Sequence, residues 1–243
     1  MQKVSNEDDI PAIRFLGVYI DPNLSYSYHI KLLNSKLSKS LYILRSVKNI
    51  LDENALKSIY YSLFHSNLIY CLPAWSCTAQ KNHKKIIKLQ KDAIRIITHS
   101  KYNSHTEPLF KKLNILPFEK LVYFFNLQFM QRYVQGFLPN SFSGLWITNQ
   151  DRRASGQTIT NETIIRSLHN SENLYIPQSR LANSSKQPYF NLPLLWSNFS
   201  QHEIKILREK SQFNLALKKY LLSLLSNTVN CTRLLCPVCH LHL

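Results

Sequence analysis

Apolar residues in the first half of the chain recur at intervals of three and four positions, which is the spacing of one face of a helix. The longest such series contains Ile30, Leu33, Leu37, Leu41, Leu44, Val47 and Leu51. A short apolar run at residues 12–20 precedes this series and predicts a strand, and Asp21-Pro22-Asn23 predicts the turn between them. The pattern therefore predicts a short β element followed by a long amphipathic helix.

The apolar content continues into residues 58–80, a segment that contains no Asp, Glu, Lys or Arg. Asp52 is predicted to cap the helix that leads into this segment, because an aspartate side chain can accept a hydrogen bond from a free amide of the first turn. The length of the segment suits a membrane span, but serines, an asparagine, a histidine and a proline interrupt its apolar residues. We interpret it as a buried core helix that ends at the Leu72–Pro73 step.

A third helix, predicted from Lys81 to His99, has two faces of opposite character. Six cations fall within one arc of about 120° on a helical wheel, and they are Lys81, Lys84, Lys85, Lys88, Lys91 and Arg95. The opposite arc is apolar except for Gln90, whose amide needs a buried hydrogen-bond partner. Asp92 alone cannot neutralise six cations by pairing along the helix. The stripe favours a face that binds a nucleic-acid backbone over the alternative, an ordinary solvated helix face.

The chain changes character after one more helix. Residues 118–134 are aromatic on almost every side and predict a largely buried helix. Residues 139–191 are rich in Ser, Thr, Asn and Gln and predict loops, with short strands near Gln157–Thr160 and Leu174–Ile176. Apolar patterning returns after these loops and predicts a terminal helix.

Together these patterns predict a mainly α-helical protein with a short N-terminal β element, a helical bundle, a loop-rich region and a terminal helix. The predicted boundaries are 1–25 for the β element, 26–136 for the bundle, 137–191 for the loops, 192–226 for the C-terminal helical segment and 227–243 for a tail of cysteines and histidines.

Composition narrows the classes of function. The chain has 243 residues and only 4 glycines, which stand alone, and this excludes the glycine-rich loops of P-loop and dinucleotide-binding proteins. Lys and Arg total 30 against 14 Asp and Glu, a formal net charge of +16 that favours a polyanionic partner. Five cysteines argue against a disulfide scaffold and for an intracellular protein, with nucleus and cytoplasm both open.

The tail carries a candidate zinc site. Thiolate and imidazole groups are zinc ligands, and the candidates are Cys231, Cys236, Cys239 and His242. The Cys-x2-Cys spacing lets two thiolates bind one ion around a tight turn, but the second half of an ordinary zinc finger is missing. A disordered tail without metal is therefore the alternative.

Several short strings follow one another along the chain. They are Phe15-Leu16-Gly17-Val18-x-Ile20-Asp21, Leu56-Lys57-Ser58-Ile59-Tyr60-Tyr61-Ser62-Leu63, Tyr70-Cys71-Leu72-Pro73-x-Trp75, Leu89-Gln90-Lys91-x-Ala93-Ile94-Arg95-Ile96-Ile97, Pro108-Leu109-Phe110-Lys111-Lys112-Leu113, Leu194-Leu195-Trp196 and Phe213-x5-Lys219. In this order they resemble the region after the polymerase palm in reverse transcriptases of non-LTR retrotransposons, the jockey-like long interspersed elements.

The resemblance implies the thumb and post-thumb part of an RNA-directed DNA polymerase. Phe15, Leu16 and Gly17 would match the primer grip, the hairpin that positions the 3′ end of the primer. The family's palm holds two divalent ions with clustered aspartates, whereas the Asp8-Asp9 pair of this chain lacks a preceding aromatic residue. The resemblance therefore implies no catalytic magnesium site and no enzymatic activity of the chain alone.

The expected function is binding to the backbone of an RNA or DNA duplex, without a membrane and with no indication of the oligomeric state. Two alternatives remain open. The chain could be a helical protein-interaction module, or the product of a decayed retrotransposon reading frame that has no selected function.

Overall fold

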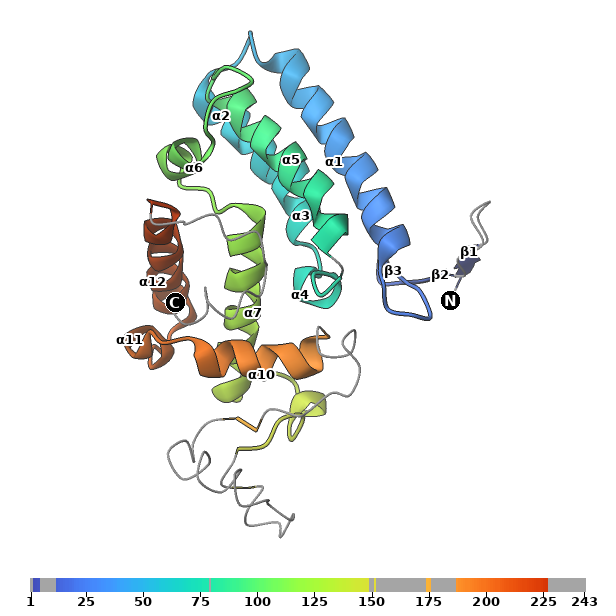
Figure 1. The fold of residues 1–243 in the computed structure, drawn as a ribbon, viewed down its shortest axis with the longest axis vertical. Coiled ribbons are helices and arrows are strands. Elements are labelled where there is room, and N and C mark those ends of the chain that lie inside the picture. Colours follow the sequence, from blue (N-terminus) through green and yellow to red (C-terminus); the bar gives the residue numbers. More distant parts are fainter. Residues whose placement is uncertain are drawn as a thin grey trace. The chain divides into compact units, whose positions relative to one another are not determined.

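The computed structural model describes residues 2–4, 12–78, 80–148, 151, 174–175 and 187–226 (Figure 1). The fold is mainly α-helical with a small N-terminal antiparallel sheet, so the predicted fold class is confirmed. The chain divides into two compact units, one of residues 1–124 with 218–234 and the other of residues 125–217 with 235–243. The predicted segments 26–136 and 192–226 each contribute residues to both units.

The sheet contains strands β1 (Gln2–Val4), β2 (Ala12–Phe15) and β3 (Val18–Ile20), paired in that order. The prediction of one strand over residues 12–20 is wrong, because the chain reverses at Leu16 and Gly17. Both residues have positive φ angles, 46° and 83°, as a two-residue hairpin turn requires. Leu16 is apolar, and the apolar run therefore continued through the turn without a break in the pattern.

The bundle of the first unit begins with α1 and the helical segment that follows it. Helix α1 (Ser27–Val47) buries the predicted apolar face, and α2 (Glu53–Ile59) begins after Asp52, whose Oδ1 accepts a hydrogen bond from the Ala55 amide at 3.1 Å. The predicted cap is therefore confirmed. The helix continues through a π-helical stretch, η1 (Tyr60–His65), into α3 (Ser66–Ile69).

The predicted end of this helix at Leu72–Pro73 is wrong. Helix α3 ends at Ile69, Cys71 adopts a left-handed conformation with φ 49°, and a separate short helix α4 (Leu72–Trp75) follows. Pro73 lies in the first turn of α4, where its missing amide hydrogen has no intrahelical role. Phe64, Leu68 and Trp75 are fully buried, as expected for a core helix. Tyr61, Leu63 and Tyr70 of the same segment are exposed, so its burial is only partial.

Helix α5 (Gln80–Ile97) completes the bundle and packs along α1 (Figure 1). A hydrogen bond of 3.0 Å from the Ser40 hydroxyl to the Leu63 carbonyl joins α1 to η1. Helix α6 (Glu107–Leu113) follows α5 and packs against it. The core of this unit is formed by side chains that are almost entirely buried, among them Leu37, Leu44, Leu56, Phe64, Ile86, Ile94 and Phe110.

Helix α7 (Phe118–Val134) has the predicted bounds and contributes to both units. Among the described residues, the C-terminal half also contains η2 (Asn140–Phe142), α10 (Pro188–Asn198), α11 (His202–Lys205), α12 (Lys210–Ser223) and η4 (Leu224–Ser226). A core cluster of the second unit contains Met130, Trp146, Leu174 and Leu192. The strand expected near residue 174 is an isolated antiparallel bridge to Thr148, and Gln157–Thr160 lies outside the described residues.

Candidate nucleic-acid interface

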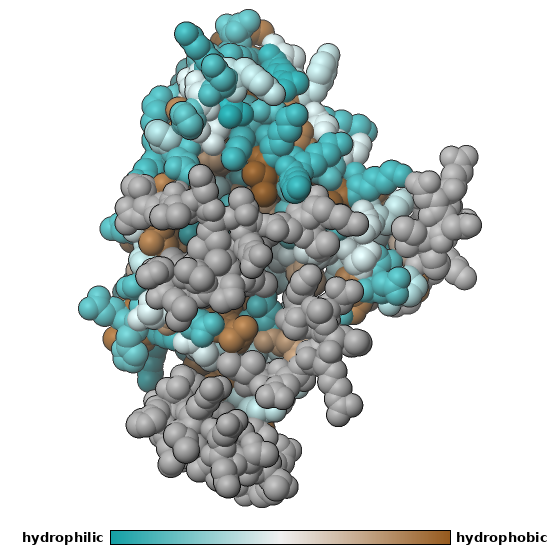
Figure 2. Space-filling view, in the orientation of Figure 1, coloured by the Kyte–Doolittle hydropathy of each residue, from teal (hydrophilic) through white to brown (hydrophobic). Residues whose placement is uncertain are grey.

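Helix α5 separates an apolar face from a cationic face, as its sequence pattern indicates. Ile86, Ile94 and Ile97 are fully buried, whereas the side chains on the other face are exposed, namely Lys84, Lys85, Lys88 and Lys91. Lys81 belongs to α5, but its side chain is not among those described. Figure 2 shows a mainly hydrophilic surface at the top of the view, where the C-terminal ends of α1 and α5 lie in Figure 1.

Arg95, the last cation of the stripe, differs from the lysines because its guanidinium is engaged by the protein. Its Nη1 donates to Asp92 Oδ1 at 3.1 Å, and its Nε donates to the Ser104 carbonyl at 3.1 Å. The guanidinium also lies 5.8 Å from the ring centroid of Tyr102. Arg95 therefore holds the loop that follows α5, and the lysines carry the charge that is available to a ligand.

The lysines of α5 have few acidic neighbours. Within the described part of the chain, no carboxylate oxygen lies within 4.0 Å of the ammonium of Lys84, Lys85 or Lys88. Lys91 lies near Glu119: burial raises the pKa of the Glu119 carboxyl, and the charges of Lys91 and Lys120 oppose that rise. The least compensated part of the cationic face is therefore its N-terminal half.

The spacing of the lysines suits a polyanion. From the first to the last of the four, seven residues separate Lys84 from Lys91, which is about 10 Å along a helix. A nucleic-acid duplex presents about six phosphate charges over that length. A rigid row of this length can therefore contact several phosphates at once.

Gln90 fixes this helix to the rest of the unit. Its Nε2 donates to the Tyr60 hydroxyl and to the Leu116 carbonyl, both at 3.0 Å, and its Oε1 accepts from the Phe118 amide at 2.7 Å. Gln90 is 1% exposed, so the expectation that its amide needs buried partners is confirmed. The lysines on the opposite face are consequently presented by a helix that is held in position.

The β2–β3 hairpin, whose sequence resembles a primer grip, presents apolar side chains to solvent. Phe15 is 48% exposed and Leu16 is 74% exposed. The Tyr70 hydroxyl donates to the Leu16 carbonyl, and the Tyr70 ring lies 3.5 Å from the position that a Cβ would take on Gly17. Tyr70 therefore stabilises the turn through a hydrogen bond to Leu16 and through contact with Gly17. Its role had no signal in the sequence, because it is more than fifty residues away along the chain.

The left-handed conformation of Leu16 is a strained feature of this hairpin. A positive φ costs a residue with a side chain about 1 kcal/mol, and asparagine or glycine is the usual choice in such a turn. An exposed leucine at a strained position has no packing role that explains it. Such strain occurs frequently at sites of function.

Three histidines in the first unit are held in the neutral form. Burial lowers the pKa of His29, His65 and His83 to about 4, with a further contribution from Lys36 for His29 and from Lys218 for His65. His83 forms a 3.1 Å hydrogen bond with the Thr78 hydroxyl and lies against the Phe118 ring. These histidines are spread over the bundle core, and none is part of the lysine face.

No candidate metal site can be placed on the structure. The four residues proposed for zinc, Cys231, Cys236, Cys239 and His242, lie outside the described residues. Among the residues that are described, no three His, Cys, Asp or Glu side chains gather as a metal site would require. Cys71 and Cys77 are free thiols, and burial raises the pKa of Cys77 to about 11.

Comparisons with known protein families, with curated proteins and with solved structures find no match to this chain. Over the described ranges, no helix has the length and the apolar content needed to cross a membrane.

Proposed function

We propose that this chain binds the sugar-phosphate backbone of an RNA or DNA duplex through the exposed lysines of α5. The observation that carries the proposal is the lysine face itself: Lys84, Lys85 and Lys88 are exposed, lack a nearby carboxylate among the described residues, and stand on a helix whose other face is buried. The formal net charge of +16 acts in the same direction, because a cationic surface releases counterions from a nucleic acid when it binds. Contacts of this kind recognise the backbone without selecting a sequence.

We further propose that the chain is the thumb-like part of a reverse transcriptase from a non-LTR retrotransposon. The support is the ordered set of strings that resemble this family, together with the exposed and strained tip of the hairpin at Phe15, Leu16 and Gly17. Under this proposal the hairpin contacts the primer strand and α5 holds the duplex. The function is binding rather than polymerisation, because the sequence offers no pair of carboxylates in the context that a two-metal site requires.

A salt-titrated binding assay with a short RNA–DNA duplex tests the lysine face. If four lysines each neutralise one phosphate, log K falls with log salt with a slope of about −3.6, which weakens binding about a hundredfold between 50 and 200 mM salt. Replacing Lys84, Lys85 and Lys88 together by Glu should make the slope shallower, with a magnitude of about 1 or smaller, and should abolish binding at 150 mM salt.

The matched control places the same charge change elsewhere. Lys101, Lys210 and Lys219 are exposed and lie outside α5, so their joint replacement by Glu lowers the net charge equally and should retain most of the affinity. Equal losses in the two triple variants would show that net charge alone drives binding, and the proposed interface would be wrong. Binding that ignores salt, or that survives the α5 variant, would favour a protein-interaction module instead.

A further inference from the structure

A tight turn follows the C-terminal end of α5, and Tyr102 lies at its tip. The Ser104 amide donates to the Lys101 carbonyl at 3.1 Å, and this hydrogen bond closes the turn. Tyr102 is 75% exposed. A single exposed aromatic residue is common on protein surfaces and by itself indicates no function. Tyr102 differs from such a residue in how its turn is held and in its position beside the lysine face.

Arg95 ties this turn to α5. Its Nε donates to the Ser104 carbonyl at 3.1 Å, and its guanidinium carbon lies 5.8 Å from the centroid of the Tyr102 ring. Asp92 Oδ1 accepts from Arg95 Nη1 at 3.1 Å and so holds the guanidinium itself. The Ser100 amide donates to the Arg95 carbonyl at 2.9 Å, which anchors the chain between the helix and the turn. The backbone that carries the Tyr102 ring is therefore held before any ligand binds, and little conformational entropy is lost on binding.

The turn lies on the lysine side of α5. Arg95, which holds it, belongs to the same arc of the helix as the exposed lysines. Arg95 is four residues beyond Lys91, which is about 6 Å along a helix. Neighbouring nucleotides of one strand in a duplex are about 3.4 Å apart along the axis, so this distance corresponds to about two nucleotides. A strand whose phosphates follow the lysines can therefore reach the Tyr102 ring.

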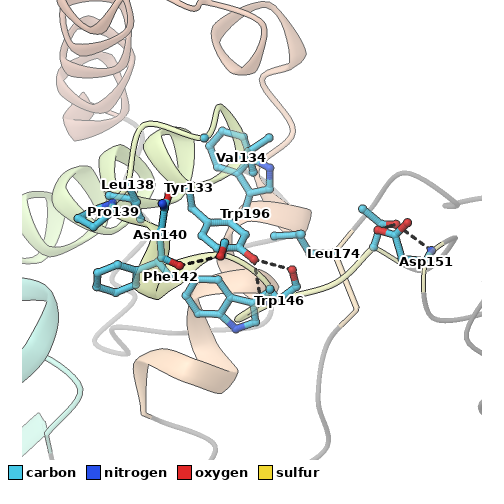
Figure 3. A pocket seen from close by; sticks show the side chains of 14 residues that line it. Tyr133, Val134, Leu138, Pro139, Asn140, Phe142, Trp146, Asp151, Leu174 and Trp196 are labelled. Atoms are coloured by element: carbon cyan, nitrogen blue, oxygen red, sulfur yellow. Dashed lines mark hydrogen bonds between the residues drawn. The ribbon is translucent and has the colours of Figure 1, made fainter.

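An exposed aromatic ring beyond a row of cations suits an unpaired nucleobase. Bases inside a duplex are stacked on their neighbours, whereas an unpaired base can offer its face to an aromatic side chain. Such stacking does not depend on which base is present. By contrast, Trp146, which lines a cavity of about 360 Å³ in the second unit (Figure 3), is 6% exposed and belongs to the core of that unit. Tyr102 is accessible to a base, and Trp146 is not.

We infer that Tyr102 stacks on the first unpaired base where a bound duplex ends in a single strand, while the lysines of α5 hold the duplex. The site thus favours a junction between duplex and single strand over a blunt duplex. The inference rests on the proposed function, because the lysines bring the junction to the ring. It involves no selection among the bases, since every base has a face that can stack.

A pair of probes with equal charge tests the inference on the full chain. One is a short RNA–DNA duplex with a three-nucleotide overhang, and the other has the same overhang with an abasic site at the first unpaired position. The chain should bind the intact overhang about tenfold more tightly than the abasic one. This ratio should be the same at 50 and 200 mM salt, because both probes carry the same number of phosphates. Overhangs at the 5′ and the 3′ end are tested separately, and the preference with either one supports the inference.

Substitutions of Tyr102 assign the preference to its ring. Tyr102→Ala should bring the ratio between the two probes to about one and leave the affinity for a blunt duplex unchanged, whereas Tyr102→Trp should keep the preference because it keeps an aromatic ring. Tyr42→Ala is the matched control, since Tyr42 is 73% exposed and lies on α1, outside the turn; it should keep the tenfold ratio. The comparison of the two probes in the wild-type chain needs no variant, so it still decides if Tyr102→Ala disturbs the turn.

The outcomes separate this inference from the proposed function. If the wild-type chain binds a blunt duplex but binds the intact and the abasic overhangs equally, the inference is overturned and the proposed function stands. The inference is also overturned if the preference survives Tyr102→Ala, or if Tyr42→Ala removes it as well. A wild-type chain that binds no duplex at all would overturn the proposed function, and the inference with it.

Discussion

Gln90 is the polar group on which the position of α5 depends most directly, so replacing it by Leu should be strongly destabilising. The substitution keeps the side-chain size roughly constant but removes three hydrogen bonds to buried partners: the Tyr60 hydroxyl, the Leu116 carbonyl and the Phe118 amide. Each buried group left without a partner costs about 1–3 kcal/mol. The apolar Leu recovers about 1–2 kcal/mol through burial.

The net loss expected for Gln90→Leu is therefore about 3 kcal/mol in the free energy of unfolding of the first unit. Urea unfolding followed by circular dichroism measures this loss, and the thermal midpoint should fall by about 6–12 °C for a chain of this size. Gln90→Glu should be at least as destabilising at neutral pH, since it removes both donated bonds and buries a charge. Part of that loss should be recovered at low pH, where the carboxyl is protonated.

Gln128→Leu is the control for this experiment. Gln128 is only half-buried and donates one hydrogen bond, of 2.9 Å, to Asn214 Oδ1, so its loss should cost no more than about 1 kcal/mol. The reasoning about Gln90 would be refuted if Gln90→Leu were as stable as the wild type, or no less stable than Gln128→Leu. Either result would mean that packing alone holds α5 against the π-helical segment and the start of α7.

Two further predictions concern the first unit. Burial lowers the pKa of His83 to about 4, below its ordinary value of about 6.5. As the pH falls, the unfolded chain therefore takes up this proton before the folded chain does. The stability that the neutral His83 contributes is fully present above pH 6.5 and is lost as the pH falls toward 4. The contribution is on the order of 3 kcal/mol. Urea unfolding at pH 7.0 and 4.5 should show a smaller change in the free energy of unfolding between the two pH values for His83→Gln than for the wild type. An unchanged difference would contradict the assignment to His83. Tyr70→Phe removes the hydrogen bond to the Leu16 carbonyl at an exposed site, so hydrogen exchange of the hairpin amides should quicken several-fold while global stability falls by no more than about 1 kcal/mol. Exchange as slow as in the wild type would show that Tyr70 does not support the turn.

The amphipathic helices were predictable from the sequence because the helical period, which decides which residues share a face, is a local property of the chain. The spacing of apolar residues correctly indicated α1, α5 and α7, and the Asp52 cap followed from the preference of one residue type for one position. The same pattern placed the lysines of α5 on the face away from the core. A helix repeats every 3.6 residues whatever surrounds it, so these inferences needed no long-range information.

Left-handed residues and long-range partners were decided by the tertiary structure. Leu16 and Cys71 adopt positive φ angles without the glycine or asparagine that usually signals them, so the hairpin turn and the end of α3 were misplaced. The need of Gln90 for a partner could be stated from sequence, but its partners lie 26 to 30 residues away. Arg95 belongs to the cationic stripe by helical spacing, but in the structure its guanidinium is bound by the Ser104 carbonyl and by Asp92.

Spacing along the sequence also does not predict which aromatic side chains line the cavity of the second unit (Figure 3). Tyr133, Trp146 and Trp196 come from a helix, a loop and another helix, and no spacing along the chain relates them. By itself, the sequence determined which helix faces turn inward and where the positive charge gathers, since both follow from residue type and helical period. Only the tertiary structure determined which distant side chains meet, because those contacts depend on turns whose backbone angles the residue types did not reveal.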